Sequence, residues 1–67
     1  MINFARRLKE LRTERELSTR KLGEAIGVTN SQIVRWENGT YDIKSEQIIK
    51  LAKHFGVTTD YLLGVEN

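Results

Sequence analysis

The residues of this chain best suited to recognition chemistry lie between positions 30 and 35. If Ile33 and Trp36 face inward on a helix, the 3.6-residue repeat places Ser31, Val34 and Arg35 on the opposite face. Such a helix fits the major groove of B-DNA, where asparagine or glutamine can pair with adenine, arginine with guanine, and valine can touch a thymine methyl group. The candidate base-reading residues are Asn30, Ser31, Gln32, Val34 and Arg35.

Polar side chains also cover any ordinary surface helix. The elements around this face therefore decide whether it is a DNA-reading surface or a solvated helix face. Apolar spacing predicts two short helices, over residues 19–26 and 30–37, that meet across a corner. Gly27 can end the first helix with a positive φ, and Thr29 can cap the second by accepting from a backbone N–H. Gly23 lies on the inner side of the first helix, where the lack of a side chain lets the second helix approach closely.

The rest of the chain reads as three further helices. Apolar residues at helical spacing predict one helix over residues 3–15, another that begins after an N-cap at Ser45, and a short last helix over residues 60–63. No segment has the alternation typical of a strand. We therefore expect an all-α fold of five helices in a single domain spanning residues 1–67.

Composition narrows the range of functions. The chain has 67 residues, no cysteine, one histidine and a formal net charge of +2, which excludes disulfides and zinc-finger chemistry and does not by itself indicate nucleic acid. It has no signal-peptide pattern and no apolar run of membrane-spanning length, so we expect a soluble cytoplasmic protein. Ser45, His54 and Asp60 match a catalytic triad by type only, because no nucleophile-elbow glycines surround a serine. We expect no enzyme activity, metal, cofactor or small-molecule ligand.

A wider set of residues carries a resemblance to a known family. The corner and its two helices contain Leu22, Gly23, Ile26, Gly27, Val28, Ile33, Trp36 and Glu37, followed by Asn38 and Gly39. With LKELRTERELS before it and IIKLAKHFGVTTDYLLG after it, this set resembles the lambda-repressor/Cro-like (xenobiotic-response-element type) helix-turn-helix transcriptional regulators over nearly the whole chain. The resemblance implies a five-helix domain that binds specific double-stranded DNA, with the motif at its second and third helices and the third helix in the major groove.

Contacts to DNA phosphates are expected at the ends of the motif helices and in the loop that follows them. The start of the second helix offers hydroxyl, cationic and backbone N–H groups, and the family commonly uses the residue matching Asn38 to contact a phosphate. Tyr41 and Lys44 can equally be read as parts of a solvated loop. The candidate phosphate contacts are Thr19, Arg20, Asn38, Thr40, Tyr41 and Lys44. The resemblance also implies a structural ion pair between Arg12 and Glu37.

Dimer formation is expected from the way such domains read DNA. Their paired half-sites lie about 34 to 36 Å apart, which predicts a homodimer on a palindromic operator. The candidate dimer surface is the apolar C-terminal segment with Tyr61, Leu62, Leu63 and Val65. Repression is the expected role, because it needs only occupancy of a promoter. The alternatives are an autoregulatory antitoxin of a toxin-antitoxin pair and a protein-interaction helical domain without DNA binding.

Overall fold

The computed structural model describes residues 2–65, and within them it contains only helices, turns and loops. The five helices are α1 (Ile2–Glu14), α2 (Thr19–Ile26), α3 (Asn30–Glu37), α4 (Ser45–Phe55) and α5 (Thr59–Leu63). The expected all-α, five-helix fold is confirmed, and the two motif helices have the predicted bounds. None of the helices in the described part of the chain is long and apolar enough to cross a membrane.

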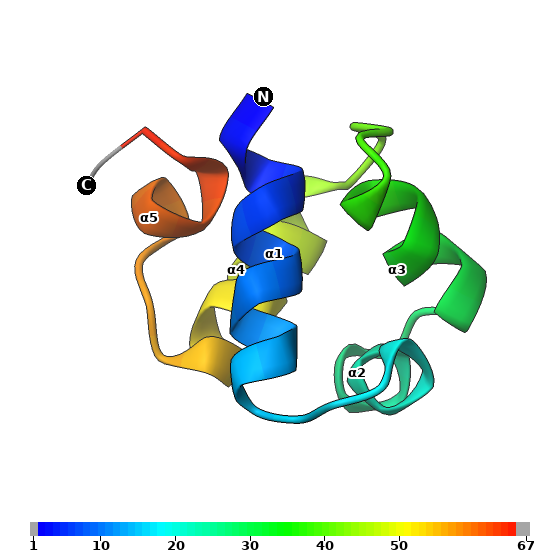
Figure 1. Cartoon of the computed structure of the whole chain (residues 1–67). Helices are drawn as coiled ribbons and strands as arrows, with labels where there is room; N and C mark the ends of the chain where they lie inside the picture. Colours follow the sequence, from blue (N-terminus) through cyan, green and yellow to red (C-terminus); the bar gives the residue numbers. More distant parts are fainter. Residues whose placement is uncertain (1, 66–67) are drawn as a thin grey trace.

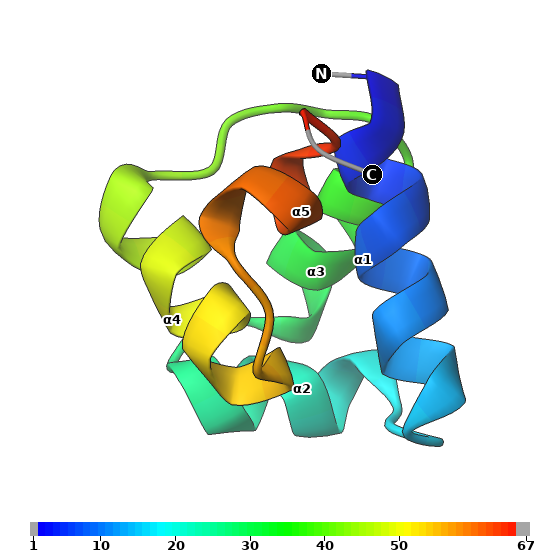
Figure 2. The ribbon, with the colours of Figure 1, turned by 90° about the vertical axis from the view of Figure 1, so that its left-hand side faces the viewer.

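The helices are arranged as a closed ring around one core. The main contacts join α1 to α3 and α5, α2 to α3 and α4, and α4 to α5. In Figure 1, α3 and α5 lie on opposite sides of α1, and in Figure 2, α2 runs along the bottom of the molecule below α3 and α4. Because α1 and α5 come from opposite ends of the sequence, the ring closes only when both ends of the chain have folded.

The core is entirely apolar in the described residues, and each helix contributes to it. Its buried members are Phe4, Leu8, Leu11, Leu22, Ile26, Ile33, Trp36, Ile48, Leu51, Ala52, Phe55 and Leu62. Burial of this apolar surface is the main force that holds short helices together, since helices of 5 to 13 residues are marginal on their own. The inward positions of α3, Ile33 and Trp36, are 0% and 1% exposed, so the orientation of this helix is set by the core.

The corner between α2 and α3 is built around two glycines. Gly27 ends α2 in the left-handed region with φ of 79°, where a side chain would be strained. The N–H groups of Gly27 and Val28 both donate to the carbonyl of Gly23, at 2.8 and 2.9 Å. Gly23 is itself buried, and a Cβ built on it would lie 2.7 Å from the carbonyl oxygen of Val28. The close approach predicted at Gly23 therefore involves the backbone of the turn rather than a side chain.

Replacing Gly23 with alanine is expected to lower the free energy of unfolding by up to about 2 kcal/mol. Alanine favours a helix over glycine by about 1 kcal/mol, but the overlap with the Val28 carbonyl cannot be relieved by a side-chain rotation, and overpacking costs about 1 to 3 kcal/mol. Urea denaturation measures the change, with Lys21→Ala on the exposed side of the same helix as the control. A Gly23→Ala protein more stable than the wild type would contradict this packing.

The start of α4 differs from the sequence prediction. Ser45 was expected to cap this helix, but it is the first helical residue, and the N-cap is Lys44. The side chain that hydrogen-bonds the backbone at the start of α4 is that of Gln47, whose Oε1 accepts from the N–H of Lys44 at 2.8 Å. The serine prediction was wrong because a glutamine three residues into the helix can close the turn without a hydroxyl at the cap. By contrast, Ser18, Thr29 and Thr58 cap their helices through their side chains.

Candidate nucleic-acid interface

The outer face of α3 is exposed along its length. Ser31, Val34 and Arg35 all point to solvent, with Val34 39% exposed. They lie opposite Ile33 and Trp36, which anchor the helix in the core. In Figure 1, α3 lies at the edge of the molecule. The helix thus offers a hydroxyl, a methyl-bearing surface and a guanidinium on one side, a mixture that can read base edges in a major groove.

The two amide-bearing candidates for base reading, Asn30 and Gln32, are already hydrogen-bonded within the domain. The hydroxyl of Thr19 donates to Oδ1 of Asn30, which ties the start of α2 to the start of α3. The Oε1 of Gln32 accepts from the N–H of Thr29 at 2.9 Å, while the Thr29 hydroxyl accepts from the N–H of Gln32 at 3.1 Å. This reciprocal pair is a capping box. The side-chain NH2 groups of these two amides are left to donate to a base. A bidentate contact with adenine also needs the amide oxygen, which would first have to break its present hydrogen bond.

Arg35 has a partner that the sequence did not reveal. Its Nη2 donates to Oδ2 of Asp42 at 2.8 Å, in an ion pair whose side chains are 48% and 46% exposed. The other oxygen of Asp42 accepts from the indole N–H of Trp36, also at 2.8 Å. Asp42 therefore connects the loop after α3 to two successive residues of that helix. The only hint in the sequence was a carboxylate seven residues beyond Arg35, in a loop whose path could not be foreseen.

The contacts of Asp42 have a measurable consequence. The hydrogen bond from Arg35, followed by that from the Trp36 indole, holds the pKa of the Asp42 carboxyl below the ordinary value of 3.8. We expect the side-chain carboxyl carbon of Asp42 to titrate in NMR spectra with a midpoint below that value. In the Arg35→Ala variant the midpoint should move up towards it, because the largest cause has been removed. An unchanged midpoint in the variant would show that the ion pair is not formed in solution.

The candidate phosphate contacts occupy two regions beside α3. Thr19 and Arg20 lie in the first turn of α2, which Ser18 caps by accepting from the N–H of Lys21. The second region is the segment after α3, and its exposed candidates are Asn38, Thr40, Tyr41 and Lys44. These two regions border the outer face of α3, which is the arrangement needed to hold phosphates of both strands beside a helix in the groove.

Tyr41 is attached to the domain rather than extended into solvent. Its ring packs edge-on against Phe4 of α1, with the ring centroids 5.8 Å apart. Phe4 is 1% exposed, whereas Tyr41 keeps 47% of its surface exposed. The contact fixes the middle of the α3–α4 loop against α1. Tyr41 is therefore in contact with the core on one side and exposed on the other, and its role towards DNA stays a prediction.

Arg12 and Glu37 form an ion pair that joins α1 to the end of α3. The Nε of Arg12 donates to Oε2 of Glu37 at 2.6 Å and its Nη2 donates to Oε1 at 2.9 Å, while Nη1 donates to the carbonyl of Leu17 at 2.8 Å. The side chains are only 14% and 7% exposed. The hydrogen bond to Glu37 raises the pKa of Arg12 above its ordinary value. One guanidinium thus connects α1, the loop before α2, and α3.

The C-terminal residues expected at a dimer surface separate into two groups. Leu62 is 0% exposed and belongs to the core, so its side chain is not available to a partner. Tyr61 and Leu63 are half-buried, and Val65 is 61% exposed. Ile49 of α4, which the sequence analysis did not include, is 46% exposed. A shallow hollow beside it is lined by Ser45, Ile48, Ile49, Thr59 and Leu63. The apolar surface near the C-terminus is therefore shared between α4 and α5.

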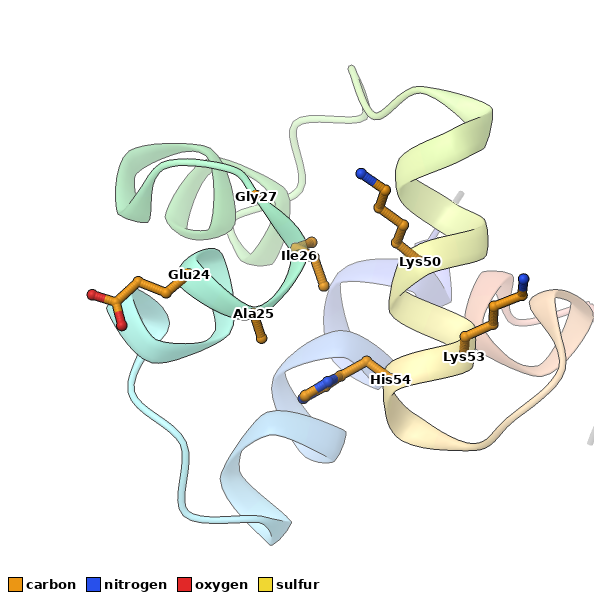
Figure 3. A pocket seen from close by; sticks show the side chains of 7 residues that line it. All are labelled: Glu24, Ala25, Ile26, Gly27, Lys50, Lys53 and His54. Carbon is orange, nitrogen blue, oxygen red and sulfur yellow. The ribbon is translucent and has the colours of Figure 1, made fainter.

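A larger open hollow of about 640 Å³ lies between α2 and α4, apart from the outer face of α3. Its lining residues are Glu24, Ala25, Ile26, Gly27, Lys50, Lys53 and His54. Figure 3 shows Lys50, Lys53 and His54 rising from α4, with Glu24 pointing away from that helix. Across residues 2–65 no group of three histidine, cysteine or acidic side chains lies close enough to hold a metal ion. The candidate interface therefore remains the face formed by α3, the start of α2 and the α3–α4 loop.

Comparisons with known proteins agree with this geometry. A family model described as Helix-turn-helix matches residues 8–62. The cryptic phage CTXphi transcriptional repressor RstR of Vibrio cholerae is 37% identical over 81% of this chain and 49% of its own length. The transcriptional activator BcrR of Enterococcus faecalis is 34% identical over 97% of this chain and 32% of its own length. This chain thus spans about half the length of the first of these relatives and a third of the second.

A solved structure also matches in three dimensions. The P22 c2 repressor, determined in complex with a synthetic operator, superimposes with a TM-score of 0.87 and 27% sequence identity. The match covers 94% of this chain and 96% of that one. Together with the fold and the exposed face of α3, these similarities define the class of protein. The chain belongs to the helix-turn-helix family, and the relatives named above are transcriptional regulators.

Proposed function

We propose that this domain binds a specific double-stranded DNA operator with α3 in the major groove and represses transcription there. The observation that supports the proposal most directly is the exposed outer face of α3, held in place by two core residues and bordered by candidate phosphate contacts. The match to a repressor that was crystallised with its operator supports the same role. The domain works by binding, and we assign it no catalytic step. The relatives come from bacteria, in which the DNA lies in the cytoplasm, so the proposed site of action of this domain is the cytoplasm.

Within this proposal, the residues divide between two tasks. Base edges are read by Asn30, Ser31, Gln32, Val34 and Arg35, of which Asn30 and Gln32 act through their NH2 groups unless their oxygens are released. Phosphates are contacted by Thr19, Arg20, Asn38, Thr40, Tyr41 and Lys44. Phosphate contacts set the register of the protein on the duplex, and the base contacts supply specificity. Arg12 and Glu37 keep α3 at a fixed angle to α1 and do not touch DNA.

We also propose that two copies bind a palindromic operator. One recognition helix reads few bases, and a two-fold dimer doubles the number read with half-sites about one helical turn apart. The hollow lined by Ile49 of α4 and Leu63 of α5 supports a partner contact on the α4 and α5 side. Size-exclusion chromatography with light scattering, with and without the operator duplex, measures this. A single copy on a duplex containing both half-sites would contradict the dimer.

Three measurements distinguish repression from activation and from the two alternative functions, an antitoxin and a protein-interaction domain. RstR is named a repressor and BcrR an activator, so the family supports both signs. Repression predicts that transcription in vitro from a promoter overlapping the operator falls when the protein is added. An antitoxin predicts in addition a stable complex with a toxin encoded beside it. A protein-interaction domain predicts no salt-dependent affinity for any duplex.

The proposal is tested by selecting bound duplexes from a random DNA pool. We expect a palindromic winner whose advantage over unrelated DNA collapses in the Arg35→Ala variant, because a good arginine–guanine pair contributes about 1 to 3 kcal/mol of discrimination. Lys53→Ala is the matched control, since it removes one positive charge from α4, outside the candidate interface (Figure 3). Selection that enriches no sequence, or a winner bound equally well by wild type and Arg35→Ala, would reject base reading through α3.

A further inference from the structure

Asp42 is an acidic residue on a face that should attract phosphates, which calls for an explanation. Its two carboxylate oxygens accept from two different side chains, the guanidinium of Arg35 and the indole of Trp36, each at 2.8 Å. Trp36 is 1% exposed, so one oxygen is fixed to the core while the other faces the exposed guanidinium. A carboxylate held at both oxygens in this way forms a rigid support for Arg35.

The contact uses only part of the donor capacity of Arg35. Arginine carries five N–H donors in a planar fork, and one of its terminal nitrogens is engaged by Asp42. Because the side chain is 48% exposed, the remaining donors can address the O6 and N7 atoms of guanine. Restricting a long side chain before DNA arrives reduces the conformational entropy lost when the contact forms.

Charge gives the pair a second effect. The carboxylate of Asp42 offsets the positive charge of Arg35, so this arginine contributes little to general attraction by phosphates. A carboxylate near the groove can also accept from the amino group of cytosine, but phosphates repel it. The pair therefore favours DNA in which the guanidinium meets a suitable base edge over DNA that offers phosphates alone.

We propose that Asp42 is a positioning residue for base recognition, which holds the Arg35 guanidinium beside α3 so that the α3–α4 loop sets sequence specificity together with α3. This inference rests on the proposed DNA-binding function. It adds the loop to the specificity determinants and assigns to Asp42 a role that acts through Arg35. Trp36 completes the arrangement by fixing the carboxylate from the core side.

The test uses Asp42→Asn, which keeps an oxygen acceptor for the Trp36 indole and removes the negative charge that faces Arg35. We expect discrimination between the selected duplex and one with the Arg35-contacted guanine replaced to fall about tenfold, within the range of one good base contact. Affinity for unrelated DNA should stay equal or rise, since a negative charge has been lost. Glu46→Gln is the matched control, because it removes the same charge from an exposed position in the first turn of α4.

A double-mutant comparison separates positioning from a merely structural role. In the Arg35→Ala background, Asp42→Asn should change discrimination no further, because its effect passes through the missing guanidinium. Additive losses in the double variant, or an equal loss of affinity for both duplexes in Asp42→Asn, would overturn the proposal. Thermal unfolding of each variant checks that the fold is intact, and Asp42→Ala provides a second variant if Asp42→Asn does not fold.

The outcomes also distinguish this inference from the function on which it rests. If the wild-type protein discriminates between duplexes and Arg35→Ala does not, while Asp42→Asn discriminates as well as wild type, only the role of Asp42 is rejected. If the wild-type protein binds no duplex selectively, DNA reading is rejected and the role of Asp42 with it. Loss of discrimination in Asp42→Asn alone among the charge-matched variants supports both.

Discussion

Replacing Glu37 with alanine is expected to lower the free energy of unfolding by about 2 to 3 kcal/mol, between the cost of breaking an exposed ion pair and that of breaking a fully buried one. The Arg12 side chain is 14% exposed and uses two of its donors on the carboxylate of Glu37. Without Glu37, only the hydrogen bond to the Leu17 carbonyl remains of the contacts described for that guanidinium. Urea denaturation followed by circular dichroism measures the loss. In a domain of 67 residues, such a loss is a large part of the total stability.

A double substitution identifies the cause of that loss. Arg12→Met with Glu37→Leu replaces both charges by apolar side chains, and we expect it to recover most of the stability lost in Glu37→Ala. Glu24→Ala removes an exposed carboxylate from α2 and should change stability by less than about 0.5 kcal/mol. A loss below about 1 kcal/mol for Glu37→Ala would mean that the pair behaves as an exposed surface salt bridge.

Operator affinity is expected to fall by a factor of about 10³ to 10⁵ when salt is raised from 50 to 200 mM. That range applies to proteins that contact about 6 to 10 phosphates, and the proposed dimer has enough candidate contacts to reach it. Each phosphate contacted releases condensed counterions, so the slope of log affinity against log salt counts the contacts. Fluorescence anisotropy with a labelled operator at a series of salt concentrations gives this slope.

A substitution at Arg20 tests one of these phosphate contacts by itself. Arg20→Ala should weaken binding to every duplex by a similar factor and reduce the salt slope by about 1 for each copy bound, since one phosphate contact is lost. Lys53→Ala, with the same change of charge on α4, should leave the slope nearly unchanged. Equal slopes for wild type and Arg20→Ala, or equal reductions in the two variants, would exclude a local phosphate contact at the start of α2.

The helices and the corner were predictable because their signals are local. The caps at Ser18 and Thr29, the left-handed glycine at the end of α2 and the apolar spacing each act within a few residues. The close approach at Gly23 could also be foreseen, because a glycine inside a helix calls for a packing reason. These features could be predicted because each depends on residues that are close together in the sequence.

The side-chain contacts of the site could not be predicted in the same way. The bond from Thr19 to Asn30 depends on how two helices are placed, and the contacts of Asp42 depend on the path of a loop. Gln32 was identified by its outward position, although its place three residues after Thr29 is the spacing of a capping box. In each case a polar side chain that was expected to contact DNA is hydrogen-bonded to another residue of the domain.

The capping box at the start of α3 limits how this domain can acquire a new binding preference. Ser31 and Val34 lie on the exposed surface, so substitutions there change what the helix presents without touching its fold. Gln32 also closes the first turn of the helix, so a substitution at this position alters stability together with recognition. Divergence among related domains, or engineering of this one, should therefore proceed first through Ser31 and Val34, and a change at Gln32 should be accompanied by a compensating change at Thr29.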